Sequence, residues 1–554
     1  MIKPSMSGNA MIAAMFEPGV HHISHDEMIP GTEVMRDDIQ GTSHAVLVPT
    51  PSSSKDDPLN WSVTWKTIVA VTQLIYVWVG VSSALSLAPV FPFLGAEFHL
   101  NTQQLSLLTG LNVVTLGVAN IFIVPISNIF GRRLTSILFG VLLVLTCVWE
   151  ALATTHKSLL AARACNGIAA ATSESIMVQV IADMCFLNER GTLMGVYFTT
   201  YFMGAFLGPI MSGNIAARHG WRSFFWLSTA LSVLALVLVI ISQPETKYHR
   251  LHRTEGHMPP EIQTTSQAEK VASSNDVTEM SKSPPPERSN SVTTAIFVGK
   301  GRPSRRQFAT YQRPDKAWKK FIVRDVTTPL LIFFNPIIFW AGLMLAGPAN
   351  LLLIYNLTES SILGASPYNF SAGAVGYTNF GCAVGGLVGV ATAGPFSDWI
   401  AKRATTRNSG IREAEMRLPA LLPYAALSLI TSVAGGFALQ NHWPWPAIVI
   451  LCYFLSGLSV SSLPTIALSY AIDCFKPISG EIMVVATLLK NILGFCLSYW
   501  VFDVAAAKGW TVVFGIQTAV VYGPVILSLP LWIYGKKIRR WYRQSGLHRM
   551  EEMI

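Results

Sequence analysis

Two charged side chains lie inside long apolar stretches of this chain: Glu174 in ATSESIMVQV and Lys490 in ATLLKNILGF. A charge within hydrocarbon is costly, so such residues usually pair with another charge or face a polar cavity. A carboxylate there can exchange a proton for a cation when its surroundings change. We expect Glu174 to bind protons or a substrate and to pair with Lys490. The alternatives are a Glu174 hydrogen-bonded to Ser173 or Ser175 in helix packing, and a Lys490 that contacts a carbonyl group or water.

The stretch around Glu174 has a counterpart later in the chain. Gly167 to Asp183 reads GIAAATSESIMVQVIAD, and Gly457 to Asp473 reads GLSVSSLPTIALSYAID. Each begins with small residues and ends in a carboxylate. At about 1.5 Å per helical residue, each covers most of a hydrocarbon core. The repeat indicates a duplicated domain, and duplicated membrane proteins with many helices are mostly carriers that bind a substrate between two halves.

The composition also indicates a membrane protein. Of the 554 residues, 51% are hydrophobic and only 13% are charged. Runs of about twenty apolar residues are long enough to cross a bilayer as helices. They predict an all-α membrane protein with twelve transmembrane helices in two six-helix pseudo-repeats. The expected spans are 67–94, 106–128, 134–155, 158–182, 192–216, 223–243, 329–356, 372–396, 418–439, 445–472, 481–503 and 511–535.

The polar segments define the expected domain limits. We expect a disordered tail over 1–65, a six-helix bundle over 66–243, a linker over 244–328, a second bundle over 329–536 and a tail over 537–554. The linker mixes Pro, Ser, Lys and Arg without a periodic apolar face, which is typical of disorder. Its last residues, DKAWKKFI, favour a short amphipathic helix. The first sixty residues lack the pattern of a cleaved signal peptide.

Basic residues set the expected orientation. Loops on one side carry Arg132, Arg133, Arg190, Lys402, Arg403, Arg407, Arg412, Arg417 and the KKIRR segment, and the other side has Lys157, Arg218, Arg222 and Lys508. By the positive-inside rule, both termini and the linker are expected in the cytoplasm. The net charge of +9 is therefore a topology signal, and we expect no nucleic acid as a partner. The seven cysteines give no disulfide framework.

Two loops carry related motifs after the second and eighth spans. GPFSDWIAKR, residues 394–403, includes Gly394, Asp398, Lys402 and Arg403. It resembles the cytoplasmic loop motif Gly-x-x-x-Asp-Arg-x-Gly-Arg-Arg of the major facilitator superfamily. The resemblance implies the major facilitator fold, and it implies that this cluster helps to close an inner gate.

The first copy of this motif, VPISNIFGRR over 124–133, departs from the pattern. Asn128 replaces the acidic residue, while Arg132 and Arg133 remain. An amide can still cap a helix, but it has no charge. A gate ion pair of these arginines must then use another acid, and we expect it to be Asp183 at the end of span four.

Span four also contains Arg163 one helical turn before Gly167. This pair resembles the superfamily motif of an intramembrane arginine followed by glycine. An arginine inside hydrocarbon costs about 2.5–3.5 kcal/mol on insertion scales, so it needs a partner or water. We expect Arg163 to take part in function. The alternative is that its side chain reaches the outer interface.

Span five contains GAFLGPIMSG, residues 204–213. Small residues at every fourth position allow another helix to approach closely, and proline bends a helix. Ordinary helix packing explains this pattern equally well. It resembles a motif of the antiporter branches of the superfamily, carried here by Gly204, Gly208, Pro209 and Gly213.

Three further segments, DDPLNWS at 56–62, NSGIREAEMRL at 408–418 and LLKNILGF at 488–495, resemble a fungal group within the drug:proton antiporter family. That group includes carriers of polyamines and other organic cations and exporters of metabolites. The resemblance covers about residues 56 to 540. It implies a monomeric, proton-coupled secondary active transporter that exports a drug, toxin or secondary metabolite, or alternatively takes up polyamines or other organic cations. The expected location is the plasma membrane, or alternatively the vacuolar membrane.

The sequence gives no sign of an enzyme or a cofactor. It has no phosphate-binding loop for ATP. Its twelve histidines fall in tails and loops, and no pair has metal-binding spacing within a span. We therefore expect no metal, and the expected partners are a small organic substrate, protons and the lipid bilayer.

Several uncharged polar residues are candidates for substrate contact or glycosylation. Asn350, Tyr355, Asn379 and Tyr470 lie in predicted spans seven, eight and ten. Each offers a polar contact to a ligand, although helix packing explains each of them as well. Asn356-Leu-Thr and Asn369-Phe-Ser bracket the expected outer loop 357–371 and are acceptors for N-glycosylation. Glu150 and Asp503 are expected as solvated helix ends.

Overall fold

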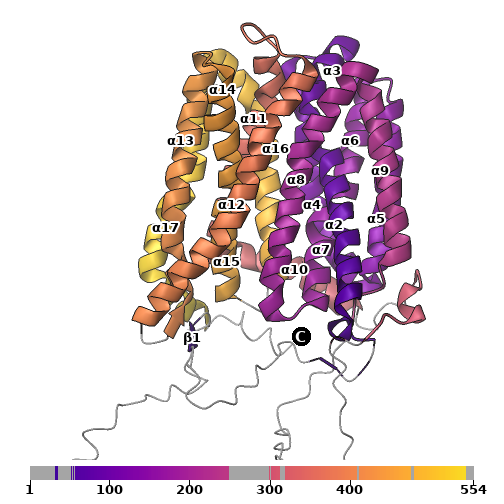
Figure 1. The fold of residues 1–554 in the computed structure, drawn as a ribbon, viewed down its shortest axis with the longest axis vertical. Helices are drawn as coiled ribbons and strands as arrows, with labels where there is room; N and C mark the ends of the chain where they lie inside the picture. Colours follow the sequence, from indigo (N-terminus) through magenta and orange to yellow (C-terminus); the bar gives the residue numbers. More distant parts are fainter. Residues whose placement is uncertain are drawn as a thin grey trace, which may run out of the picture.

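The computed structural model describes residues 32–34, 51–52, 54, 56–248, 299, 301–311, 318–408, 411–475 and 479–543. Long helices dominate this part of the chain and run side by side from one end of the molecule to the other (Figure 1). We call the lower end in Figure 1 the basic end, because it carries Arg132, Arg417 and Arg539. The opposite end carries the loop 364–371.

The first half contains six spans. They are α2 (Val63–Leu85), α4 (Thr102–Phe130), α5 (Arg132–Leu152), the pair α6 (His156–Ala170) and α7 (Thr172–Met184), α8 (Leu187–His219) and α9 (Trp221–Ser242). A short 3-10 helix η2 (Pro58–Asn60) precedes them, and η3 (Ala88–Val90) and α3 (Phe91–Phe98) follow α2. Ser62 caps α2 by accepting a hydrogen bond from Trp65 N, as is usual for a serine at this position.

The second half repeats this arrangement. After η4 (Arg305–Phe308) and α10 (Trp318–Phe333) come α11 (Pro336–Leu363), α12 (Ala372–Arg407), the 3-10 segment η5 (Ala414–Ala420), α13 (Leu421–Gln440), α14 (Trp445–Ile448) with the π-helical η6 (Val449–Phe454) and α15 (Leu455–Cys474), α16 (Ser479–Lys508) and α17 (Trp510–Arg543). A two-stranded antiparallel sheet pairs β1 (Thr32–Val34) with β2 (Ile411–Glu413).

The expected twelve spans agree with this structure, with one difference in span four. In the described part of the chain, eleven helical segments are long and apolar enough to cross a membrane alone. The remaining span consists of α6 and α7, which a turn at Ala171 divides. Glu174 N bonds to Ala171 O at 3.0 Å, a tighter i to i−3 bond, while Ala171 N still bonds to Gly167 O at 3.1 Å. The helix therefore tightens one turn before Glu174 instead of running on regularly.

The duplication inferred from the sequence is visible in helix packing. Gly167 lies so close to α4 that an added Cβ would collide with the carbonyl oxygen of Asn112. Gly457 lies equally close to α12, where a Cβ would collide with the carbonyl oxygen of Cys382. Because only glycine permits both crossings, the same small residue brings equivalent helices together in each half.

The two halves meet mainly through α4 against α16 and α8 against α12. Toward the basic end, α12 leans away from α8 (Figure 1). At the opposite end the contact is tight. Ser106 Oγ donates to Ser498 O at 2.7 Å, and Gln103 Nε2 donates to the exposed Asp503 carboxylate at 3.1 Å. The structure therefore has its halves joined at the opposite end.

Part of the predicted linker and tails is ordered, contrary to our prediction. Gly301 forms a parallel bridge with Trp61, with Ser62 N donating to Gly301 O at 2.9 Å. Phe308 then packs edge-on against Trp65 at 6.1 Å between ring centroids. Backbone hydrogen bonds and one aromatic ring make this contact, so no apolar periodicity marks it in the sequence. Residues 249–298, 300 and 312–317 lie outside the described residues.

The expected domain limits change in three places. Residues Pro58–Asn60 and the start of α2 belong to the folded bundle, although we assigned 1–65 to a disordered tail. The helix favoured by DKAWKKFI is present as α10, but it crosses the expected boundary at 328, ends at Phe333 and packs against α4 and α16. The last helix, α17, continues to Arg543 and so extends beyond the expected boundary at 536.

Candidate functional site

Glu174 lies in the first turn of α7, and Lys490 lies in α16 of the other half. The expected contact between them is present: Lys490 Nζ lies 2.6 Å from Glu174 Oε1. The side chain of Glu174 is 1% exposed and that of Lys490 is 13% exposed. This buried ion pair joins the two halves near the middle of the bundle.

Three further groups hold the Glu174 carboxylate. Tyr201 OH donates to Oε1 at 2.7 Å, and Asn120 and Asn491 donate to Oε2 at 3.0 and 3.1 Å. Tyr201 also touches Lys490, whose Nζ lies 2.9 Å from the phenol oxygen and 4.9 Å from the ring centroid. With four donors around two oxygens, the site is built for an ionised carboxylate. Neither Ser173 nor Ser175 contributes to it, so the packing alternative is wrong.

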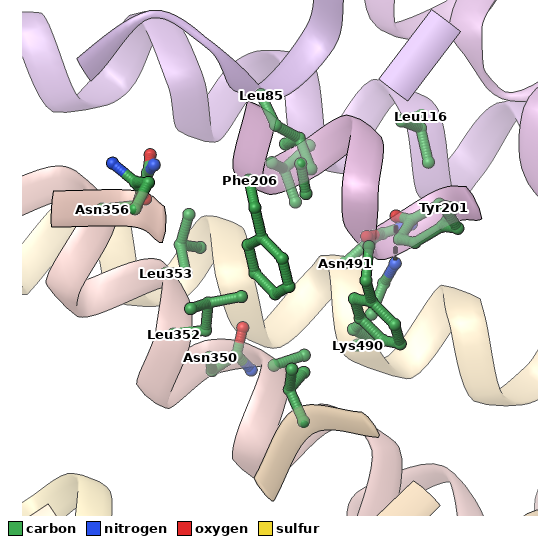
Figure 2. A pocket seen from close by; sticks show the side chains of 16 residues that line it. Leu85, Leu116, Tyr201, Phe206, Asn350, Leu352, Leu353, Asn356, Lys490 and Asn491 are labelled. Carbon is green, nitrogen blue, oxygen red and sulfur yellow. Dashed lines mark hydrogen bonds between the residues drawn. The ribbon is translucent and has the colours of Figure 1, made fainter. Parts of the chain in front are cut away.

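A cavity lies beside this pair, between the two halves (Figure 2). It contains about 720 Å³ of empty space, counting the part that opens to solvent. Tyr201, Lys490 and Asn491 lie on one side of it and Asn356 on another, with Phe206 between them (Figure 2). The remaining wall is mostly Leu, Val, Ala and Phe. Such a mixture of apolar surface and a few polar groups suits a small organic ligand.

Only half of the predicted uncharged polar residues reach this cavity. Asn350 and Asn379 line it. Tyr355 does not, because its OH donates to Thr431 O at 2.7 Å inside the second half. Tyr470 is fully buried and packs edge-on against Trp340 at 5.7 Å. The prediction was wrong for both tyrosines, since helix rotation turns them into the core of the second half.

The glycosylation prediction also changes. We placed the end of span seven at 356, but α11 continues to Leu363, so Asn356 lies inside a helix and lines the cavity. An acceptor asparagine must be accessible on a surface loop, and Asn356 does not meet that condition. Asn369 lies in the exposed loop at the opposite end, with φ of 50°.

Arg163 belongs to a buried network in the first half, so its side chain does not reach the outer membrane–water interface. Both Arg163 and Glu150 are 0% exposed, and Nη1 lies 3.3 Å from Glu150 Oε1. The guanidinium also donates to the carbonyl oxygens of Ser83, Ala84 and Leu108. It therefore links α2, α4, α5 and α6. Our expectation of a solvated Glu150 was wrong, because the arginine compensates its burial.

The predicted gate arginines of the first half behave differently from each other. Arg132 Nε lies 2.9 Å from Asp183 Oδ2, which is the pair expected from the loss of the motif acid. Arg133 instead donates to the last carbonyl groups of α9, including Ile240 O at 2.7 Å. Asn128 Nδ2 donates to Asp325 of α10 at 2.5 Å, so it contacts the helix that leads into the second half.

Glu245, which follows α9, completes this cluster and was missed by the sequence analysis. Its carboxylate accepts hydrogen bonds from Arg132 N and Arg133 N at 2.9 and 3.1 Å, at the start of α5. Acidic groups stabilise helix N-termini in this way. Burial raises the pKa of the Glu245 carboxyl, while these backbone groups and that of Lys247 act in the opposite direction.

In the second half, Arg417 holds the motif acid. It lies 2.9 Å from Asp398 and 2.8 Å from Asp473, the counterpart of Asp183. Lys402 and Arg403 are exposed. Within the part of the chain described, no ion pair of Lys402 or Arg403 with an acid is present, and the Arg403 guanidinium stacks on Trp399 at 5.5 Å. Their predicted gate contact is therefore not formed in this state.

Replacing Asp398 with alanine should favour the state in which the basic end is open. Asp398 is 64% exposed here, and Arg417 keeps Asp473, so this state loses little. A state with the basic end closed would lose the contact of Asp398 at the interface of the two halves. Such a contact is worth about 1 kcal/mol at most, which corresponds to roughly a fivefold change in the ratio of the two states. Labelling of cysteines placed at the basic end measures this change. Unchanged labelling of the Asp398→Ala protein would argue against a gate role.

The four residues of the predicted antiporter motif lie at two interfaces. Added Cβ atoms at Gly204 and Gly208 would meet α2 at Trp78 O and its C-cap residue at Ser86 Oγ, respectively. Gly213 faces Ala372 of α12 in the other half, and the Pro209 carbonyl lies beside Gly376 of α12. The motif therefore allows close helix approach both within the first half and across the seam at the opposite end.

Two six-helix halves around a shared polar and apolar cavity define a multi-pass membrane transporter. The chain belongs to the Major Facilitator Superfamily, because the sequence profile of that family matches residues 74–499. It is 25% identical to protein HOL1 of Saccharomyces cerevisiae, over 95% of this chain and 97% of that protein. It is 22% identical to efflux pump radE of Floropilus chiversii, over 87% of this chain and 83% of that protein.

A solved structure agrees with this assignment. The human organic anion transporter MFSD10 (TETRAN) matches 84% of this chain and 99% of its own, with a TM-score of 0.54 and 13% sequence identity. At that identity the similarity establishes the fold. The predicted family and helical architecture are confirmed, and radE is described as a pump, not as an enzyme.

Proposed function

We propose that this protein is a proton-coupled secondary active transporter that exports a small organic compound, such as a drug, a toxin or a secondary metabolite. The observation that carries the proposal is the buried pair of Glu174 and Lys490, one from each half, beside the central cavity. The description of radE as an efflux pump supports the direction.

The pair suits alternating access because it depends on the relative position of the halves. While the halves lie as they do here, Lys490 neutralises Glu174. Movement of one half against the other separates Lys490 from Glu174 and leaves the carboxylate to take a proton or a cationic group, because an uncompensated buried charge is unstable. Return of Lys490 displaces the proton. A charge that must always be compensated thereby links conformational change to proton binding.

Transport driven by an imposed pH gradient tests this proposal. We would reconstitute the protein in vesicles and follow rhodamine 6G and those compounds of a toxin panel to which a deletion strain proves sensitive. Export coupled to protons requires that substrate moves against the direction of proton flow. Substrate transport in the same direction as proton flow would favour uptake of polyamines or other organic cations. Substrate transport that does not depend on the pH gradient would contradict proton coupling.

The proposal places the basic end, both termini and the linker in the cytoplasm and the opposite end outside, in the plasma membrane or alternatively the vacuolar membrane. A single chain suffices, because the cavity is formed by its own two halves.

Glycosylation tests this orientation. If the opposite end is translocated, the exposed Asn369 receives the glycan and the helical Asn356 does not. The Asn369→Gln protein should lose the mobility change produced by glycosidase, and Asn356→Gln, its matched control, should retain it. Loss of the change in the Asn356 variant alone would contradict the assignment of α11.

A further inference from the structure

A second buried acid, Glu359, lies near the cavity but outside the Glu174 network. It is in α11, in the part of the chain that we had expected to form the outer loop, and it is 1% exposed. The next residue, Ser360, donates a hydrogen bond to Ala88 O of the first half. Glu359 therefore lies beside the contact that closes the opposite end.

Glu359 has little compensation for its burial. Asn379, which lines the cavity, donates a hydrogen bond from Nδ2 to Glu359 Oε2 at 2.8 Å. The other oxygen, Oε1, is buried and has no hydrogen-bond partner among the described residues. Three other buried acids each have a cation: Glu150 has Arg163, Glu174 has Lys490 and Glu415 has Arg539.

Among the described residues, no cation forms an ion pair with Glu359. The titratable groups close enough to be affected by its charge are the thiol of Cys382 from α12 and the phenol of Tyr453 from η6. The segment η3, which packs against α11, consists of Ala, Pro and Val. On the other neighbouring elements, Lys490 is on Glu174 and Glu97 of α3 is on Arg222, while Asp503 and Lys508 of α16 are exposed.

We propose that Glu359 is a second proton-binding site, which must take up a proton before the opposite end of the transporter can close. An ionised carboxylate with one amide donor and no cation would cost several kcal/mol to bury. The neutral acid avoids that cost. When the opposite end opens, water reaches the seam and the charged form is tolerated.

The proton balance is simple. On closure, the Glu359 carboxylate takes one proton from hydronium in the water at the opposite end, which leaves one water molecule. On opening, the carboxylic acid returns that proton to water. Glu174 acts in the opposite direction, because in the proposed mechanism it releases its proton when Lys490 returns. With Glu174 replaced by glutamine only Glu359 titrates, and one proton bound on closure then makes the ratio of closed to open states change by up to tenfold per pH unit. This proposal does not require Glu174 to carry a proton.

Distances across the opposite end as a function of pH test the proposal. Spin labels at Lys157→Cys in α6 and Ala365→Cys in the loop 364–371 occupy exposed positions, with the exposed Cys496 replaced by serine. In full-length Glu174→Gln protein in nanodiscs, the population with the shorter distance should increase as the pH falls. When Glu359→Gln is added, that population should dominate at every pH, because the amide is always neutral.

A conservative variant keeps the test decisive. Glu359→Asp in the same Glu174→Gln background retains an acid, so the pH response should persist with a displaced midpoint. This variant also serves if Glu359→Gln fails to fold, and an unchanged midpoint would then overturn the proposal. An undiminished response after Glu359→Gln is added to Glu174→Gln, or no response in Glu174→Gln alone, would overturn the proposal without affecting the role proposed for Glu174.

Discussion

Glu174→Gln should abolish proton-driven transport while the protein still folds. Glutamine has nearly the same shape as glutamate and keeps an oxygen acceptor for Asn120 and Asn491. It loses the charge-assisted bond to Lys490, worth about 1.5–3 kcal/mol, and it cannot take up a proton. Coupled transport should therefore fall to the background of empty vesicles, because the step that exchanges Lys490 for a proton no longer exists.

The measurement for this prediction is the initial rate of transport under an imposed pH gradient, normalised to the amount of folded protein. Glu97→Gln is the matched control, because Glu97 also accepts bonds from a cation, Arg222, but is 40% exposed at the opposite end. That variant should retain coupled transport. A Glu174→Gln protein with the rate and pH dependence of the wild type would remove Glu174 from the mechanism.

Arg163→Ala should destabilise the protein more than any surface substitution. The change leaves Glu150 as a buried carboxylate without its cation and removes the donor to three carbonyl groups. Breaking a buried ion pair by removing one partner costs about 3–5 kcal/mol. We expect low yield and early unfolding in detergent, measured by thermal stability.

Two variants separate the charge effect from the loss of packing. Combining Arg163→Ala with Glu150→Gln should recover part of the stability, since the stranded acid is then neutral. Arg222→Ala breaks the pair of Arg222 with Glu97, whose side chains are 39% and 40% exposed, and should cost at most about 1 kcal/mol. If Arg163→Ala unfolds no earlier than Arg222→Ala, the buried network does not stabilise the first half.

The charged residues of the site were predictable because a charge in a membrane span is rare and must be compensated. Glu174 and Lys490 were the two charges nearest to the middle of predicted spans, and each turned out to compensate the other. The loss of the motif acid at Asn128 likewise predicted the pair of Arg132 with Asp183.

Uncharged polar residues were less predictable because their role depends on the rotation of each helix. Tyr201 and Asn120 complete the Glu174 site, whereas Tyr355 faces the core. Asn491 adjoins Lys490 in the sequence, which was the one available signal for it. No pattern in a single sequence distinguishes a cavity-facing tyrosine from a buried one.

The end of span seven was misplaced for a related reason. The sequence LTESS after Asn356 is polar, so hydropathy ends the span there. In the structure these residues continue α11, because Glu359 bonds to Asn379 and Ser360 bonds across the seam to Ala88. Tertiary hydrogen bonds satisfy polar groups that a scale of side-chain polarity assigns to water.

A double-mutant cycle between Glu174 and Lys490 tests most directly whether their contact joins the two halves. The unfolding of detergent-solubilised wild-type, Glu174→Ala, Lys490→Ala and doubly substituted proteins would be compared. We predict that Lys490→Ala alone is less stable than the double variant, with a coupling energy of about 0.5–3 kcal/mol, because the single change strands a buried carboxylate. Losses that simply add would mean that the two residues do not interact, and would contradict the mechanism built on their pairing.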